Sequence, residues 1–411
     1  MREIFMDYAN ATPVDERVFE AMKPFFLEKY GNPSSHIIKV GNEAVRALDD
    51  SRKTVANFIK ALPEEITFCA SATEANNLAL KGIAFSNSYK GNHIIVSNIE
   101  HFSITSPVTT LANKFGFQTS FIDVDNDGFV DSTQLKKTLK TETKLVSIQL
   151  ANNEIGVIQN IKELVKIVKS YNEKIIFHTD ATAAAGLLQI DVNDLGVDLL
   201  TFSATSLYGP KGAAALYVKN GVFLQPLIEG GFQEKGLRSG TENMPAIVGF
   251  AKACELASVE MAERVEHLKK LRDKLQKGLE EKIDFLHFTG SLKNRLPNNL
   301  SFWIEFAEGE SLLLMLNYMG VMVSSGSACS SNLRARDEDE LVASPVLKAI
   351  GVPSDICTGS LTFSLGVKNT EEEVDYVLEI FPGIVQRLWQ MSPFYLDKIK
   401  GHTPKMTKVD K

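Results

Sequence analysis

Short apolar runs alternate with amphipathic stretches of helical length through the first half of the chain, and this alternation most constrains the fold. The runs are rich in Ile, Val, Leu and Phe and occupy residues 65–69, 93–97, 145–150, 174–179, 199–203 and 215–218. Amphipathic segments such as residues 104–116 and 161–171 lie between them. Strands that alternate with helices predict an α/β fold with a mostly parallel sheet covered by helices on both faces.

The second half of the chain has a different pattern. From Thr241 the sequence predicts a long helix pair over residues 241–281, followed by strand-like segments at 285–290 and 298–306. We therefore expect a large α/β domain at residues 13–255. A smaller α+β domain is expected from residues 1–12 and 256–411 together. The basic end of the chain lacks apolar periodicity and is predicted to be a frayed tail.

Composition narrows the class of protein. The chain has 411 residues, 44% of them hydrophobic, and a formal net charge of -7, which argues against a nucleic-acid-binding surface as its main feature. No apolar stretch approaches the length of a membrane span or of a signal-peptide core, so a cytoplasmic location is expected. The four cysteines are far apart, which predicts neither a disulfide framework nor a zinc site. Cys69 and Cys254 are predicted to be small buried apolar residues.

One motif is similar to a calcium-binding loop. Asp123, Asp125 and Asp127 precede Gly128 with the spacing of the first half of such a loop. The twelfth position is Gln134, which cannot supply the bidentate carboxylate, and the segment follows a strand rather than a helix. A polar turn between a strand and a helix is therefore predicted here.

A set of short polar motifs follows the predicted strands in a fixed order. They are Ala72–Asn77, Glu100–His101, Asn152–Gly156, Asp180–Thr182, Tyr208–Gly212, Arg238–Asn243 and Ser324–Ser331. In order and spacing the set resembles the cysteine desulfurases of the NifS/IscS type, and the resemblance covers nearly the whole chain. It implies the class V aminotransferase fold. That fold is the fold-type I architecture of pyridoxal phosphate (PLP) enzymes, with a mostly parallel seven-stranded sheet in the large domain.

The resemblance also implies a PLP pocket, and the residues agree with it. Thr73 is expected at a helix N-terminus, where free N–H groups favour a phosphate. Asp180 is expected just past a strand end, where its carboxylate can hold a pyridinium nitrogen, although a helix N-cap is a second reading. By resemblance His101 stacks on the cofactor ring. The remaining pocket positions carried over from the family are Asn153, Ser203, Thr205, Ser206 and Thr241. The motif at residues 238–243 reaches the partner subunit's phosphate in this family, which implies a homodimer.

This chain departs from the family at the catalytic lysine. The family pattern Ser-Gly-His-Lys reads Ser203-Ala-Thr-Ser206 here, and serine cannot form an imine with PLP. Lys211 does not replace that lysine, because the family has a lysine there as well. Three further positions have lost the family's glutamine, substrate-binding arginine and histidine; they are Ala183, Thr362 and Leu150. We therefore expect no covalently bound PLP and no PLP-dependent desulfurase activity.

The cysteine loop retains the family pattern. Residues 324–331 keep the small-residue sequence around Cys329, which in the family accepts sulfur as a persulfide. A thiolate is also a ligand for iron. Cys329 is therefore predicted to act as a persulfide carrier or as a transient ligand of a 2Fe-2S cluster, toward an IscU-like scaffold protein; an idle thiol kept by ancestry is the alternative. The charged residues 334–340 are predicted to be a solvated insertion, with a partner contact as the alternative.

Three functional hypotheses stay open at this point. The leading one is a cysteine desulfurase homologue of iron–sulfur cluster assembly that works through Cys329 without PLP chemistry. The second is an active enzyme that converts L-cysteine to L-alanine plus an enzyme persulfide. It would hold PLP non-covalently through Thr73, Asp180, Ser203 and Thr241. The third is a non-catalytic regulatory partner of an active paralogue.

Overall fold

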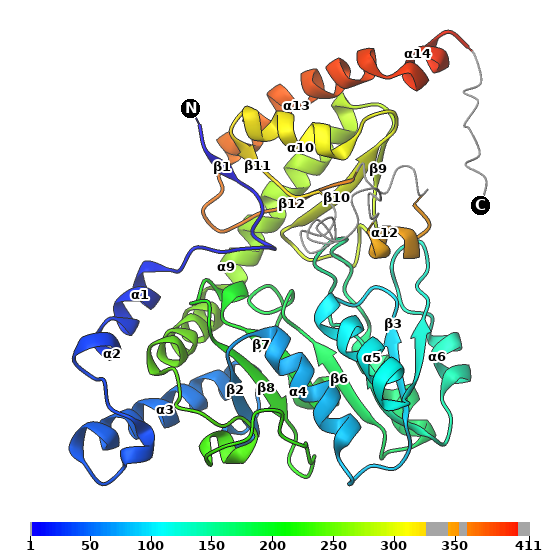
Figure 1. The fold of residues 1–411 in the computed structure, drawn as a ribbon. Coiled ribbons are helices and arrows are strands. Elements are labelled where there is room, and N and C mark those ends of the chain that lie inside the picture. The colour runs from blue at the N-terminus through cyan, green and yellow to red at the C-terminus, as the bar shows by residue number, and fades with distance from the viewer. Residues whose placement is uncertain (1, 326–343, 353–359, 402–411) are drawn as a thin grey trace.

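A central sheet organises the larger part of the computed structural model, which describes residues 2–325, 344–352 and 360–401 (Figure 1). Within these residues the sheet has seven strands in the order β2-β8-β7-β6-β5-β3-β4. Only β8 runs against its neighbours, so the predicted mostly parallel α/β sheet is confirmed. The strands are β2 (Ile66–Cys69), β3 (His93–Ser97), β4 (Gln118–Ile122), β5 (Thr143–Ser147), β6 (Ile176–Asp180), β7 (Leu199–Ser203) and β8 (Ala214–Val218).

Helices cover both faces of this sheet. On one face α4 (Ala72–Phe85) and α5 (Phe102–Phe115) pack against side chains such as Ile94 and Leu145. On the other face α3 (Lys39–Phe58), α7 (Ile161–Tyr171) and the first half of α9 pack against the next residues along the strands, including Ile95 and Val146. Because successive side chains of a strand point to opposite faces, each buried strand contributes to both apolar cores.

The strand β4 was not among the runs predicted from the sequence. Its sequence QTSFI has one buried residue, Ile122, while Gln118 and Phe121 are exposed. It lies at the edge of the sheet and pairs only with β3. An edge strand buries less apolar surface than a central one, so its composition gave a weaker signal.

A second group of elements surrounds a separate apolar core. Within the described residues a three-stranded antiparallel sheet has the order β12-β10-β9, and β1 pairs with β11. Phe302, Phe363 and Phe381 lie at the centre of this core, which the N-terminal residues Ile4 and Met6 join. The elements are β1 (Ile4–Phe5), β9 (Leu286–Phe288), β10 (Asn299–Ile304), α10 (Gly309–Tyr318), β11 (Val321–Met322), α12 (Pro345–Ala349), β12 (Ser360–Ser364), α13 (Glu371–Met391) and α14 (Pro393–Ile399). The predicted boundaries, 13–255 against 1–12 plus 256–411, stay a prediction.

One long helix, α9 (Met244–Lys282), connects the two groups of elements (Figure 1). The predicted helix pair at 241–281 is therefore wrong. Asn243 caps the start of the helix, Pro245 lies in its first turn, and no later proline interrupts it. Phe250 packs in the core of the large sheet, whereas Leu275 packs in the second core. Burial at both ends favours one continuous helix.

The segment similar to a calcium loop is a turn between β4 and α6 (Ser132–Thr138), as predicted. The side chain of Gln134 accepts a hydrogen bond from the backbone N–H of Asp123 and donates to its carboxylate, at 2.7 and 3.0 Å. The shorter elements α1 (Glu16–Met22), α2 (Pro24–Leu27), α8 (Val192–Leu195), η1 (Pro33–Ser35), η2 (Pro63–Glu65), η3 (Thr205–Leu207) and η4 (Gln233–Gly236) complete the described chain. No helix in the described ranges is long and apolar enough to cross a membrane.

Candidate active site

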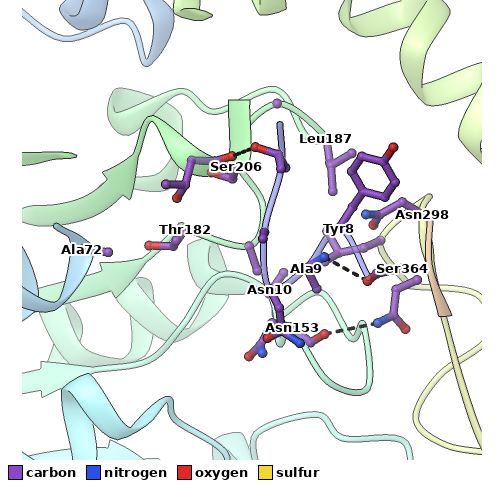
Figure 2. A pocket seen from close by; sticks show the side chains of 18 of the residues that line it. Tyr8, Ala9, Asn10, Ala72, Asn153, Thr182, Leu187, Ser206, Asn298 and Ser364 are labelled. Atoms are coloured by element: carbon purple, nitrogen blue, oxygen red, sulfur yellow. Dashed lines mark hydrogen bonds between the residues drawn. The ribbon is translucent and has the colours of Figure 1, made fainter. Parts of the chain in front are cut away.

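A cavity of about 290 Å³ lies at the carboxyl ends of the parallel strands (Figure 2). This is where an open α/β sheet places its ligands. Loops that follow β2, β3, β5, β6 and β7 form one side of the cavity. The N-terminal segment from Tyr8 to Thr12, together with Asn298, Asn299 and Ser364 from the second group of elements, forms another.

Most of the residues predicted for the pocket lie together around this cavity. Those that line it are Thr73, His101, Asn153, Asp180, Thr205 and Ser206. Ser203 lies just behind, where its Oγ is 2.7 Å from Oγ1 of Thr205. Thr241 is exposed and does not line the cavity of its own chain. Its expected contact with a partner subunit stays a prediction.

The N-terminus of α4 faces the cavity through Ala72 and Thr73. Ser71 caps the helix by accepting the N–H of Glu74 at 3.1 Å. Glu74 in turn pairs with Arg238, whose Nε lies 2.9 Å from Oε1. The free N–H groups of a helix start favour an anion, so this end of the cavity suits a phosphate.

Asp180 is held by donors on two sides. Asn76 Nδ2 donates to Oδ2 at 2.7 Å, and the N–H of Thr182 donates to Oδ1 at 2.9 Å. Asn76 Nδ2 also donates to Ser103 Oγ at 2.8 Å, and that oxygen lies 2.8 Å from His101 Nδ1. A continuous hydrogen-bonded chain therefore joins the acid to the histidine across the cavity wall, and it fixes both side chains.

Two ionisable groups behind the cavity are kept neutral by burial. Burial lowers the pKa of His178 to about 4, and its ring nitrogens contact Ser147 and Thr201. Burial also raises the pKa of Glu100 to about 8, although Ser97 hydrogen-bonds its carboxyl. Both groups are therefore mostly uncharged at neutral pH, which leaves the side chain of Asp180 available to pair with a cationic nitrogen in the cavity.

Ser206, which by resemblance stands where the family has its lysine, lies on η3 and lines the cavity. Its Oγ donates to the carbonyl of Ser203 at 3.1 Å. Lys211 is exposed and does not line the cavity. Among the described residues that line the cavity there is no lysine at all. The phosphate and pyridine ends of the cavity thus fit PLP, whereas an amine for a covalent bond is missing from this part of the chain.

The other three positions at which the chain differs from the family pattern, Ala183, Leu150 and Thr362, lie in different surroundings. Ala183 lines the cavity and leaves only a methyl group there. Leu150 is buried in the core of the large sheet. Thr362 is buried in β12, where its hydroxyl lies 3.4 Å from the carbonyl of Glu154 and from Ser301 Oγ. None of them replaces the lost polar contact with the cavity.

Several residues of the cavity wall were not predicted from the sequence; Arg264 from α9, Asn298 and Asn299 line it. Tyr208, which begins one of the motifs found in the sequence, lines the cavity as well. Arg264 is one of many charged residues in a helical run, and Asn298 begins a strand-like run, so no sequence pattern marked either of them. Oγ1 of Thr182 and Oδ1 of Asn298 are buried without a hydrogen-bond partner in the described structure. Such groups are costly unless a ligand or water satisfies them.

The described cysteines are both buried. Their burial was predicted, and it raises the pKa of the Cys69 and Cys254 thiols well above the ordinary value, which makes them poor nucleophiles. Cys329 and the charged insertion at 334–340 lie outside the described residues.

Comparisons with known proteins agree with this geometry. The family model described as aminotransferase class-V matches residues 4–377. The chain is 46% identical over 393 residues to the cysteine desulfurase IscS of Dictyoglomus turgidum, covering 96% of this chain and 97% of that protein. A solved NifS-like protein superposes with a TM-score of 0.86 at 38% identity, over 94% of this chain and all of the other. A structure described as SspA in complex with cysteine gives a TM-score of 0.75 at 32% identity, over 89% and 100% of the two chains.

Proposed function

The chain belongs to the class V aminotransferase family and, within it, to the cysteine desulfurases of the IscS/NifS type; from this premise we propose that it serves iron–sulfur cluster assembly without forming a covalent bond to PLP. In this proposal Cys329 carries sulfur as a persulfide, or lends a transient ligand to a 2Fe-2S cluster, toward an IscU-like scaffold protein. The sulfur comes from a donor other than this pocket.

The observation that carries the proposal is the environment of Ser206. Its hydroxyl donates a hydrogen bond to the carbonyl of Ser203, and no lysine lines the described part of the cavity. Serine cannot form the imine on which the family's chemistry depends. The small-residue sequence around Cys329, in contrast, is retained.

A second candidate is a PLP enzyme that holds its cofactor non-covalently and releases sulfur from cysteine. The contacts of Asp180 with Asn76 and Thr182 favour it, because they would keep a carboxylate ready for a pyridinium nitrogen. The start of α4 would hold the phosphate through the N–H groups near Thr73. Bound PLP would supply an electron sink, while these residues bind and orient it.

The proposed assembly is a homodimer, supported by exposed apolar side chains beside the segments 33–36 and 232–235, which line one surface hollow. Ile37 and Phe232 are 88 and 94% exposed. Gln233, next to Phe232, contacts both Ser34 Oγ and the N–H of Gly240, at 3.3 and 3.2 Å. Exposed apolar groups of this size mark a protein contact. Thr241 follows Gly240, so a second copy seated on this surface would meet Thr241.

Cluster assembly with purified components tests the proposal. The protein is mixed with an IscU-like scaffold, ferrous iron, a persulfide donor and a reductant that supplies the electrons for reducing sulfane sulfur to sulfide, and the absorbance of the 2Fe-2S cluster is followed. We expect Cys329→Ser to abolish the acceleration and Cys357→Ser, the matched loss of a thiol, to retain it. A Cys329→Ser protein that accelerates assembly normally contradicts the proposal.

Two parallel measurements separate the other candidates. Sulfide release from L-cysteine by the unchanged protein with added PLP would favour the second candidate over the first. Co-purification with an intact desulfurase, without cluster assembly by the protein alone, would indicate the regulatory partner. Size-exclusion chromatography with light scattering tests the dimer: Phe232→Glu should give a monomer, whereas Phe121→Glu on the edge strand β4 should not.

A further inference from the structure

Arg264 is a buried cation on the wall of the cavity. Its side chain is 9% exposed, and with Leu268 one turn later it brings α9 to the cavity. Among the described lining residues, only Arg264 and His101 can carry a positive charge. A guanidinium keeps its charge at every physiological pH, so this part of the wall is permanently cationic.

One edge of the guanidinium is already occupied. Nε and Nη2 both donate to Oε2 of Glu260, at 3.2 and 2.7 Å. Glu260 does not line the cavity, and its other oxygen pairs with Arg17 at 2.5 Å. Arg17 also pairs with Asp15 at 2.8 Å, so two arginines and two carboxylates form one cluster, in which Glu260 occupies only the Nε–Nη2 edge of Arg264.

The opposite edge of the guanidinium is open. Nη1 has no hydrogen-bond acceptor among the described residues, and Nη2 has a second N–H beyond the one used by Glu260. The guanidinium carbon lies 5.5 Å from the centre of the Tyr208 ring, which fixes its plane. Tyr208 is itself fixed, because its hydroxyl accepts the N–H of Val367 at 2.9 Å. An open, pre-oriented guanidinium edge matches the two oxygens of a carboxylate.

The wall near Tyr8 also contains an unused acceptor. The rings of Tyr8 and Tyr208 are 6.1 Å apart, and Figure 2 shows Tyr8 and Asn298 on the same side of the cavity. Oδ1 of Asn298 is buried without a partner in the described structure, while its Nδ2 donates to the carbonyl of Leu365. An ammonium group would satisfy that oxygen.

We propose that Arg264 binds the carboxylate of a small molecule in this cavity through its Nη1 edge. Thr362, buried within β12, supplies no cation for this purpose. Carboxylate binding by Arg264 does not depend on whether Cys329 carries sulfur. A failure of carboxylate binding and a failure of cluster assembly can therefore be told apart.

Binding of three thiols that differ in their charged groups tests this inference. L-cysteine carries a carboxylate and an ammonium, 3-mercaptopropionate carries the carboxylate alone, and cysteamine carries the ammonium alone. Isothermal titration under reducing conditions should show that the unchanged protein binds the two carboxylates and binds cysteamine at least tenfold more weakly. Arg264→Met should weaken both carboxylates by about 10- to 100-fold, the range expected for a charge-assisted hydrogen bond.

Arg17→Met is the matched control, because it removes a partner of the same Glu260 but leaves the cavity wall intact. It should retain the affinity for both carboxylates. If Arg264→Met does not fold, judged by circular dichroism, Arg264→Lys replaces it; the loss of the planar fork should still weaken binding several-fold. The proposal is overturned if the Arg264 variant binds the carboxylates with unchanged affinity, or if Arg17→Met loses as much affinity as the Arg264 variant. It is also overturned if the unchanged protein binds neither carboxylate, or if it binds cysteamine as tightly as the carboxylates.

Discussion

Arg52 and Glu234, 182 residues apart in the chain, form a buried bidentate ion pair. Nη2 lies 2.5 Å from Oε1, and Nη1 lies 2.7 Å from Oε2. The side chain of Glu234 is 2% exposed and also accepts the N–H of Phe68 at 2.8 Å, while the guanidinium lies over the Phe68 ring. The pair thus joins α3 and β2 to the loop that precedes the Arg238–Asn243 motif.

Removal of Glu234 should destabilise the protein strongly. Glu234→Ala leaves the charge of Arg52 without a counter-ion, although Nη1 still donates to the carbonyl of Ile66, and leaves the N–H of Phe68 without an acceptor. We therefore expect the free energy of unfolding to fall by about 3–5 kcal/mol. Urea denaturation measures it. Lys235→Ala is the control: Lys235 shares a positive φ with Glu234, but its exposed amine only donates to the carbonyl of Glu64. An equal loss in both variants would assign the effect to the backbone and not to the ion pair.

A lysine introduced at position 206 should restore covalent attachment of PLP. The substitution Ser206→Lys gives up the hydrogen bond to the Ser203 carbonyl, about 1 kcal/mol, and places an amine in the cavity. After incubation with PLP, borohydride reduction and digestion, mass spectrometry should find the label at position 206 of the variant and none in the cavity of the unchanged protein. Lys211→Ala in both backgrounds controls for surface labelling. Labelling of the unchanged protein that disappears with Lys211→Ala would make Lys211 the attachment residue.

The sequence predicted correctly those helices and strands whose buried faces give a regular pattern of apolar residues. The inner strands of the sheet are apolar on both faces, and the polar motifs after them meet at one edge because the strands are parallel. For this reason Thr73 and Asp180 could be placed at one cavity from the sequence, whereas Ser206 was placed there only by the resemblance to the family.

The parts that the sequence did not predict depend on packing between distant segments. The strand β4 is half exposed, and α9 continues through its centre because both of its ends are buried in separate cores. Arg264 and Asn298 reach the cavity only because the second group of elements docks against the strand ends. Residue type and spacing carry no information on that docking, so neither residue could be identified from the sequence.

Neutralising Asp180 should weaken non-covalent PLP binding. Asp180→Asn keeps the shape of the side chain and one of the two hydrogen bonds that it accepts from Asn76 and Thr182, but it removes the negative charge that would pair with a pyridinium nitrogen. Equilibrium dialysis with PLP should show an affinity lower by about tenfold or more. Asp191→Asn, which changes an N-cap of α8 away from the cavity, should leave the affinity unchanged. Equal affinity of the two variants, or no binding by the unchanged protein, would rule out the second candidate function.

Glu100 should make stability depend on pH across the neutral range. Its Oε1 accepts hydrogen bonds from Ser97 Oγ and from the N–H of Gln149, while Oε2 is buried without a partner in the described structure. Burial raises the pKa of this carboxyl to about 8, from the ordinary value of about 4.5 that it has in an unfolded chain. The folded protein therefore holds a proton that the unfolded chain has released between these two values.

The sign of the effect follows from that difference in bound protons. As the pH rises from about 5 to 8, the free energy of unfolding should fall, by at most about 1.4 kcal/mol per pH unit from this group. Glu100→Gln resembles the protonated form and should remove this slope, so the variant gains stability relative to the unchanged protein as the pH rises. Urea denaturation at several pH values measures the difference, and Glu28→Gln on the surface controls for the lost charge. Parallel pH profiles of the Glu100 variant and the unchanged protein would mean that the carboxyl is already ionised in the folded state.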